Sequence, residues 1–222
     1  MYTLYHHPSC PFCRCARIVL AEKEIDFNME VLEPWKDQED ILHLNPAGNL
    51  PILMTPSEDV ICGYRPICNY INEITMNPLL PNEAMVRAEI RWVCDFFNEN
   101  FYHAVTKPLL TARIYTRLCG ITADANCLRT GHRNREIYLN MFEQMLHKDD
   151  YVGCHEFSFG DVAAGAHVSL LDYCGEMVWD TEKYPRIYEW YSAVKSRPSF
   201  QKLLTDRIGT IIPSRTYANL DF

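Results

Sequence analysis

The sequence predicts an α/β domain followed by an all-α domain within 222 residues. Three observations support this fold class. In residues 1–75, short apolar stretches that suit β-strands alternate with helical patterns. From residue 84 onward, only helical periodicity is found. Residues 76–83 lie between the two parts and contain Pro78 and Pro81, so we expect a linker there.

The chain opens with a predicted strand and a tight turn. Residues 2–5 are rich in aromatic and β-branched side chains, which favours a short strand. Pro8 follows and ends it. Pro11 suits the first turn of a helix, because the N–H that proline lacks has no partner there. Apolar residues at helical spacing then extend this helix to about Lys23.

Two cysteines lie at the start of this helix, Cys10 and Cys13. Free backbone N–H groups and the helix dipole favour a thiolate at Cys10, and Cys13 lies one turn further on. A Cys-x-x-Cys at a strand-to-helix junction is typical of thioredoxin-type redox sites. Half of a zinc site is an alternative, but no second Cys-x-x-Cys or His-x-x-His pair follows, so we expect no metal. Buried, inert cysteines are a further alternative.

The rest of the first domain continues the alternation of strands and helices. Pro51 falls near the start of a strand, where a missing hydrogen-bond donor is tolerated. The predicted elements are a strand at 27–32, a helix at 37–44, a turn at 45–49, strands at 50–54 and 60–62, and a helix at 64–74. This order predicts a thioredoxin-like layout.

The second domain is predicted to be a bundle of helices. Ser158 and Asp161 have the spacing of a capping box, and the helix after them is strongly apolar, so it should form the buried centre. The expected helices cover residues 84–118, 124–147, 159–173, 181–196 and 199–207. No clear periodicity is found in residues 212–222.

Composition excludes several classes of protein. A net charge of −8 argues against a general nucleic-acid surface. No run of 18 apolar residues is present, so we expect no membrane span. The N-terminus lacks the pattern of a signal peptide, which predicts a cytoplasmic protein whose ten cysteines are mostly free thiols.

Taken together, the motifs resemble those of the glutathione S-transferase superfamily over essentially the full length of the chain. The matching motifs are the strand and thiol turn ending at Cys10, the segment 45–48 before Leu50-Pro51, the segment 78–81, and the capping box 158–161. The resemblance implies a thioredoxin-like N-terminal domain at 1–75, a linker at 76–83 and a helical domain of the transferase type at 84–222. It also implies glutathione as co-substrate.

The resemblance also assigns roles to residues of the first domain. The backbone of Leu50 would bind the cysteinyl part of glutathione, and Pro51 would be cis. Cys10 would form a mixed disulfide that Cys13 could resolve. A transferase that only activates glutathione would instead use the Cys10 thiol, Ser9 or, less well placed, Tyr5 as a hydrogen-bond donor to the bound thiolate.

The segment after the fourth predicted strand departs from the family pattern. Family members normally have an acidic residue followed by serine there, and these bind the γ-glutamyl group of glutathione. This chain has Gly63 and Tyr64 in their places. Each lost contact to a charged group would cost about 1.5–3 kcal/mol.

A second resemblance points to binding rather than catalysis. Residues 87–92, 196–200 and 217–222 resemble an alphaproteobacterial branch of the superfamily, whose known member is a dimeric scaffold that binds the tubulin-like division protein FtsZ. The apolar residues of the tail would suit a partner groove. The alternative is that the tail packs on its own domain.

The sequence therefore supports two function classes. The first is a glutathione-dependent enzyme that performs glutathione transfer or thiol–disulfide exchange at Cys10. The second is a non-catalytic scaffold that binds FtsZ through its helical domain and tail. In either case the resemblance implies a homodimer, with a seam expected at residues 85–93, where Val86, Ile90 and Val93 share one helix face.

Overall fold

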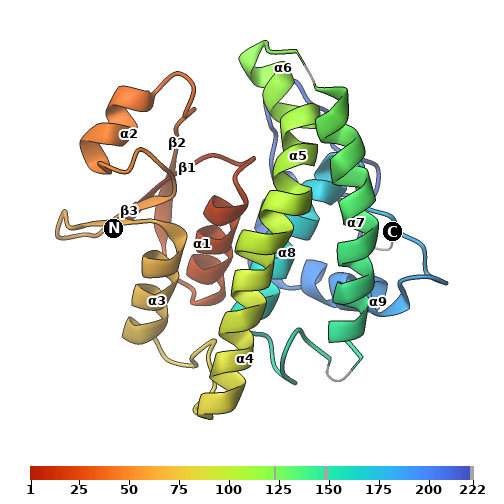
Figure 1. Ribbon diagram of the computed structural model, residues 1–222. Coiled ribbons are helices and arrows are strands. Elements are labelled where there is room, and N and C mark those ends of the chain that lie inside the picture. Colours follow the sequence, from red (N-terminus) through yellow and green to blue (C-terminus); the bar gives the residue numbers. More distant parts are fainter. Residues whose placement is uncertain (123, 148–149, 221–222) are drawn as a thin grey trace. The chain divides into compact units, whose positions relative to one another are not determined.

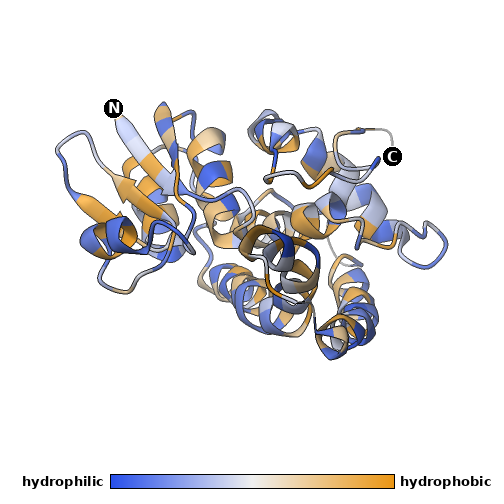
Figure 2. Ribbon diagram, turned by 90° about the horizontal axis from the view of Figure 1, so that it is seen from above, coloured by the Kyte–Doolittle hydropathy of each residue, from blue (hydrophilic) through white to orange (hydrophobic). Residues whose placement is uncertain are grey.

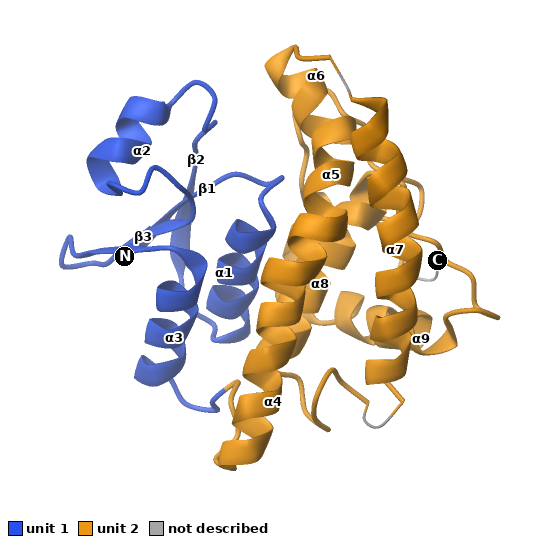
Figure 3. Ribbon diagram, viewed as in Figure 1, with its two compact units in different colours: residues 1–78 blue, residues 79–222 orange. Residues whose placement is uncertain are grey.

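The computed structural model describes residues 1–122, 124–147 and 150–220, and the chain divides into two compact units. The first covers Met1–Pro78 and the second Leu79–Phe222 (Figure 3). The first combines a sheet with helices and the second is helical (Figure 1), as the predicted fold class requires.

The first unit is built on a four-stranded mixed sheet. Strand β1 is paired in parallel with β2 and antiparallel with β3, and β3 is antiparallel with β4. The strand order is β2-β1-β3-β4. The strands are β1 (Tyr2–His6), β2 (Phe27–Val31), β3 (Ile52–Met54) and β4 (Val60–Cys62). The register places Tyr5 opposite Ile52 and Ile52 opposite Cys62.

Three helices complete this unit: α1 (Pro11–Glu22), α2 (Gln38–Leu44) and α3 (Tyr64–Ile74). Helices α1 and α3 lie side by side (Figure 1). Strand β3 begins at Ile52, two residues later than the sequence suggested. Leu50 is bent out of the strand and Pro51 has no N–H for the ladder, but the Pro51 carbonyl still accepts the Gly63 N–H at 2.9 Å.

The second unit begins with one long helical run. It consists of α4 (Ala84–Asp95), η1 (Phe96–Thr106), α5 (Lys107–Leu110), η2 (Thr111–Tyr115) and α6 (Thr116–Cys119), which follow one another without a break. The segments η1 and η2 are π-helical, and the Lys107 N–H accordingly donates to the Tyr102 carbonyl, five residues earlier. The predicted helix at 84–118 therefore exists, with two wider stretches inside it.

A proline inside this run is compensated by a neighbouring helix. Pro108 has no N–H, so it cannot donate to the carbonyl of Ala104, four residues earlier. The side chain of Asn134 donates its Nδ2 to that carbonyl at 3.0 Å. Asn134 lies on α7 (Ala125–Met145), so the packing of α7 brings this carbonyl a donor that Pro108 cannot provide.

The remaining helices enclose a buried centre. They are α8 (Phe159–Tyr173), α9 (Pro185–Lys195), α10 (Pro198–Gln201) and the 3₁₀ turn η3 (Lys202–Thr205). All fifteen residues of α8 are buried, and the Ser158–Asp161 capping box forms as the sequence predicted. The other helices alternate hydrophobic and hydrophilic positions (Figure 2). Helix α9 starts at Pro185 rather than at 181, because residues 182 and 183 donate their N–H groups to Asp180 in a turn.

The helix face expected at a dimer seam is used inside the unit. Ile90 is 0% and Val93 1% exposed, so neither is available to a second subunit. Met85 (75%) and Trp92 (55%) are the large apolar residues of α4 that remain exposed. Ile90 and Val93 therefore belong to the interior of the chain, while the homodimer and the position of its seam stay predictions.

The buried helix α8 also carries a neutral histidine. His167 Nδ1 lies 2.9 Å from Thr106 Oγ1, and Nε2 lies 3.3 Å from Asn98 Oδ1. Burial lowers the pKa of His167 to about 3. None of the helices within the described ranges has the length and apolar character that crossing a bilayer requires.

Candidate functional site: the thiol turn and the C-terminal anchor

The turn between β1 and α1 holds Cys10 at the helix N-terminus. Cys10 is the N-cap residue of α1, with φ −93° and ψ 119°. Its N–H donates to the His7 carbonyl at 3.0 Å, and its own carbonyl accepts the Arg14 N–H at 3.1 Å. Its side chain is half-buried and that of Cys13 is fully buried. Cys10 therefore has the more accessible of the two sulfurs.

The two thiols have opposite pKa shifts. A hydrogen bond from the Cys13 side chain lowers the pKa of Cys10, and the backbone N–H groups of Cys13 and Phe12 lower it further against the opposing effect of burial. Burial raises the pKa of Cys13 well above its usual value. Cys10 is therefore the group that ionises first, with Cys13 as the proton donor that stabilises its thiolate.

Two buried arginines lie beneath this turn on α1. Arg14 is 0% exposed and its Nε donates to the Pro8 carbonyl at 3.0 Å. The positive charge of Arg14 lowers the pKa of Cys10, and that of Arg17 lowers the pKa of Cys13. Both arginines therefore contribute positive charge inside the fold, next to the thiols.

Ser9, the alternative hydroxyl donor, is engaged inside the turn. It is 0% exposed, and its Oγ lies 2.6 Å from His7 Nδ1, which also accepts the Ser9 N–H at 3.2 Å. The His7 ring packs edge-on against Trp35, with 4.9 Å between the ring centroids. This arrangement fixes the shape of the turn, and the role of Ser9 toward a ligand stays a prediction.

The predicted site residues of the sheet meet the thiols in one cluster. Cys13 and Leu50 are buried in it with Ile41 and Ile52, and Tyr5, Cys10 and Cys62 pack against it. The peptide bond between Leu50 and Pro51 is cis, as the family resemblance implied. The structure thus brings Cys10, Cys13 and Leu50 together, although the last is forty residues away in sequence.

Cys62 is a third thiol at this cluster that the sequence reasoning missed. Its Sγ contacts the Leu44 carbonyl at 3.7 Å, and burial raises its pKa. The sheet register brings Cys62 to the cluster, because Tyr5 lies opposite Ile52 and Ile52 lies opposite Cys62 on three neighbouring strands. That register requires the strand pairing and cannot be read from the sequence alone.

The residues that replace the acidic-serine pair form a different structure. Gly63 caps α3 with φ +85°, a conformation that side-chain-bearing residues rarely adopt. Tyr64 stacks on Phe12 of α1, with 5.2 Å between ring centroids and 22° between planes. Arg65 donates from Nη2 to the Tyr64 hydroxyl at 3.3 Å. An aromatic pair therefore occupies the position of the usual small hydroxyl residue.

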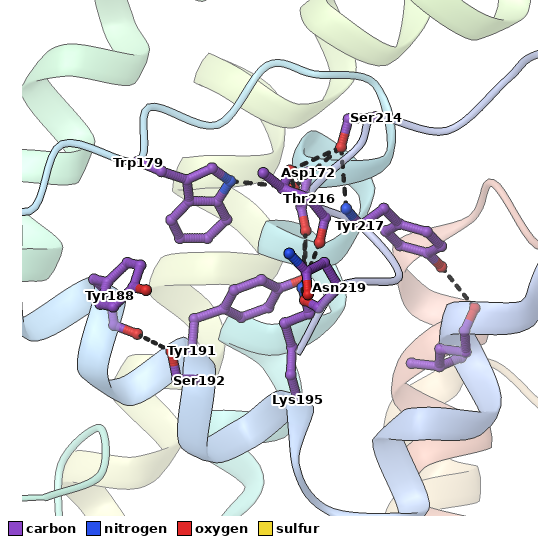
Figure 4. Close-up of polar contacts among 11 residues, drawn as sticks. Asp172, Trp179, Tyr188, Tyr191, Ser192, Lys195, Ser214, Thr216, Tyr217 and Asn219 are labelled. Carbon is purple, nitrogen blue, oxygen red and sulfur yellow. Dashed lines mark hydrogen bonds and ion pairs between the residues drawn. The ribbon is translucent and has the colours of Figure 1, made fainter. Parts of the chain in front are cut away.

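Far from the thiols in sequence, a buried acid and a buried lysine anchor the end of the chain (Figure 4). Asp172 and Lys195 are both fully buried, and Lys195 Nζ lies 3.7 Å from Asp172 Oδ2. The same Nζ donates to the Thr216 carbonyl at 2.6 Å and to the Asn219 carbonyl at 2.5 Å. Asp172 in turn accepts hydrogen bonds from the side chains of Trp179, Tyr191, Ser214 and Thr216.

This anchor bears on the predicted tail. Tyr217 is 0% exposed and donates its hydroxyl to the Leu203 carbonyl at 2.6 Å, while Leu220 is 40% exposed. The tail therefore packs on its own unit at least as far as Asn219. Asp221 and Phe222, to which the sequence assigned an accessible charged end, lie outside the described residues.

Among the residues that are described, no three His, Cys, Asp or Glu side chains gather as metal ligands would.

Comparison with known proteins agrees with this architecture. The model of the glutathione S-transferase N-terminal domain matches residues 9–74, and that of the C-terminal domain matches residues 91–198. FtsZ-localized protein A of Caulobacter vibrioides is 33% identical over 99% of this chain and 98% of its own length.

Solved structures give the same result. A glutathione S-transferase from Rhodospirillum rubrum is 36% identical, with a TM-score of 0.95 over 100% of both chains. FzlA from C. crescentus is 33% identical, with a TM-score of 0.94 over 100% of this chain and 99% of its own. With both domain models and full-length relatives in agreement, this chain belongs to the glutathione S-transferase family.

Proposed function

We propose that this chain is a transferase-fold scaffold that binds the tubulin-like division protein FtsZ, and that it acts in the cytoplasm. The similarity to FtsZ-localized protein A carries the proposal, because it extends over 99% of this chain at 33% identity. A match of that length includes both units and the anchored tail.

The altered glutathione site supports this proposal. Gly63 provides no carboxylate for the ligand's ammonium group, and the Tyr64 ring lies against Phe12 with its hydroxyl bonded to Arg65. Two lost contacts of about 1.5–3 kcal/mol each would weaken glutathione binding strongly. The cysteinyl side of the site keeps Leu50, so the residues present fit only part of the ligand.

A homodimer is part of the proposal. Trp92 and Met141 are exposed and line a pocket of about 360 Å³ in the second unit, together with Glu89, Val93, Phe96, Gln144, Met145 and Gly153. This pocket lies beside the buried face of α4, and it takes the place of that face as the proposed contact surface between the two subunits. Sedimentation equilibrium should give a mass near twice 25.9 kDa, and a monomer at all concentrations would refute the dimer.

The binding proposal is tested by co-sedimentation with purified FtsZ polymers. The wild-type chain should pellet with FtsZ in the presence of GTP and stay in the supernatant without FtsZ. The Cys10→Ser variant should pellet equally, because a scaffold does not need the thiol. Absence of the wild-type chain from the pellet would contradict the proposal.

Thiol chemistry at Cys10 is the second candidate, and the lowered pKa of Cys10 favours it. The Cys10 thiolate would attack one sulfur of a substrate disulfide, forming a mixed disulfide and releasing the other half as a thiolate. The Cys13 thiol would then lose its proton and attack the Cys10 sulfur of the mixed disulfide, forming the internal disulfide and releasing the second half of the substrate as a thiolate. Such a reaction reduces the substrate by two electrons and oxidises the protein by two.

Calorimetric titration with reduced glutathione separates the two candidates. Saturable binding at millimolar concentration or tighter would favour the enzyme, and its absence would favour the scaffold. If Gly63 and Tyr64 cause weak binding, the double change Gly63→Glu, Tyr64→Ser should tighten it at least about tenfold, equivalent to 1.4 kcal/mol. Tyr64→Ser alone is the control, because φ +85° at Gly63 adds strain to the double variant.

A further inference from the structure

The basic residues of the second unit are concentrated in one stretch. Residues 107–135 contain six Lys and Arg side chains and only one acidic residue, Asp124, whereas the whole chain has a net charge of −8. The stretch runs from α5 through α6 into the first half of α7. The rest of the chain is correspondingly acidic.

A buried carboxylate gathers two arginine side chains and one histidine side chain of this stretch. The Glu176 side chain is 3% exposed and accepts from Arg113 Nε at 2.5 Å, His132 Nε2 at 2.7 Å and Arg135 Nη1 at 3.0 Å. Arg135 Nη1 also donates to the Glu176 carbonyl. One carboxylate thus holds two guanidinium groups and an imidazole, which leaves net positive charge at the surface.

Arg113 and His132 face solvent, whereas the side chain of Arg135 is only 19% exposed. The side chain of Arg113 is 41% exposed and that of His132 is 37% exposed. Each guanidinium has five N–H donors. Within the described residues, Arg113 uses only Nε and Arg135 only Nη1. Because Glu176 fixes both side chains, an anion would meet donors that are already ordered, which reduces the entropy cost of binding.

Two further arginines extend the same surface along α7. Arg129, His132 and Arg133 stand at positions i, i+3 and i+4, so they share one helix face, and both arginines are exposed. The acidic residue on that face, Glu136, is paired with Lys183 at 2.5 Å. We define the basic face as Arg113, Arg129, His132, Arg133 and Arg135.

We propose that the basic face docks an acidic peptide segment of a partner protein, with partner carboxylates bound by its arginines. Charge complementarity identifies the occupant, since planar guanidinium groups pair well with carboxylates. A long nucleic acid is disfavoured because the remainder of the chain would repel it. The inference rests on the proposed scaffold function and names a surface and a chemistry for it.

The test uses the full-length chain and two ligands, FtsZ polymers and a fluorescent octaglutamate peptide. Arg129→Glu with Arg133→Glu reverses two charges of the basic face without touching the Glu176 contacts. Lys36→Glu with Lys202→Glu makes the same total change at exposed sites elsewhere. The first double variant should weaken binding of both ligands at least tenfold and reduce its salt dependence, and the second should not.

The outcomes separate this inference from the proposed function. If FtsZ binds the wild type and the Arg129, Arg133 variant equally, the basic face is not the docking surface, although the scaffold function stands. If FtsZ does not bind the wild type, the scaffold function fails, and loss of octaglutamate binding in the variant alone supports the acidic-peptide surface. Tighter binding of a single-stranded oligonucleotide of equal charge than of octaglutamate would overturn the choice of occupant.

Discussion

Lys195 and Asp172 form an ion pair that is fully buried in the second unit, with 3.7 Å between Nζ and Oδ2. Burial lowers the pKa of Lys195, and Asp172 opposes this shift. The lysine is also bound by two carbonyls of the C-terminal segment. The pair therefore links α8, α9 and the segment after residue 213.

Removing the lysine charge should destabilise the fold. In Lys195→Met, Asp172 loses its cationic partner and the carbonyls of Thr216 and Asn219 lose their donor, so we expect the free energy of unfolding to fall by about 3 kcal/mol. Urea denaturation measures this. Lys202→Met, at an exposed lysine of η3, is the control and should stay within about 0.5 kcal/mol. A loss below about 1 kcal/mol for Lys195→Met would show that the pair is dispensable.

The anchor also predicts where the chain tolerates truncation. Deleting residues 220–222 removes no acceptor of Lys195, so the free energy of unfolding should change by no more than about 1 kcal/mol. Deleting residues 214–222 removes both acceptors and the buried Tyr217 ring, and the loss should exceed about 3 kcal/mol. Thermal and urea unfolding of the two truncated chains test the difference. Equal stability of both would be inconsistent with an anchoring role.

The hydrogen bond from Cys13 predicts how the acidity of Cys10 depends on its neighbour. This bond is the main cause of the lowered Cys10 pKa, so Cys13→Ala should raise that pKa toward the ordinary value of about 8.5. The ultraviolet absorbance of the thiolate against pH gives the value, with Cys10→Ser as the blank. A wild-type Cys10 that already titrates near 8.5 would rule out the activated thiol.

His167 predicts a loss of stability in acid. Its folded pKa of about 3 lies below the unfolded value of about 6.5, so the unfolded state binds more protons between these values. The stabilising contribution is complete above pH 6.5 and falls by up to about 1.4 kcal/mol per pH unit as pH decreases through that window.

Asp161 acts in the opposite direction, since burial raises its pKa to about 6 and its contribution is lost as pH rises toward that value. The comparison of wild type with His167→Gln isolates the histidine, because Asp161 is common to both. In urea denaturation between pH 5 and 7.5, the free energy of unfolding of the wild type should exceed that of His167→Gln by an amount that becomes smaller below about pH 6.5. A constant difference in the free energy of unfolding across that range would mean that His167 does not cause the loss of stability in acid.

Local patterns predicted most of the fold. The strand, turn and helix around Cys10 depend on neighbours in the sequence, such as Pro8 and Pro11, and the capping box at Ser158 depends on a residue three positions away. These patterns predict the structure correctly because each depends on interactions between residues within one turn of the chain. The start of α9 was misplaced because Asp180, a turn residue, lies just before the predicted helix.

Pairings between distant residues could not be predicted in this way. Phe12 stacks on Tyr64, and Glu176 gathers Arg113 and Arg135, but none of these partners is close to another in sequence. Their meeting depends on strand register and on helix packing. The sequence therefore indicated Cys10, Cys13 and Leu50, which the structure brings into one cluster, but it did not indicate Cys62 or the cationic surface of the second unit. The functional role of these residues stays a prediction.

The bond between Asn134 and the Ala104 carbonyl has an evolutionary consequence. With Pro108 in place, loss of Asn134 leaves a carbonyl without this partner, whereas an N–H at position 108 would supply a replacement from the helix itself. The two positions should therefore covary among descendants of this protein. A lineage that has exchanged Pro108 for another residue is free to change Asn134 afterwards, and the reverse order carries the greater penalty.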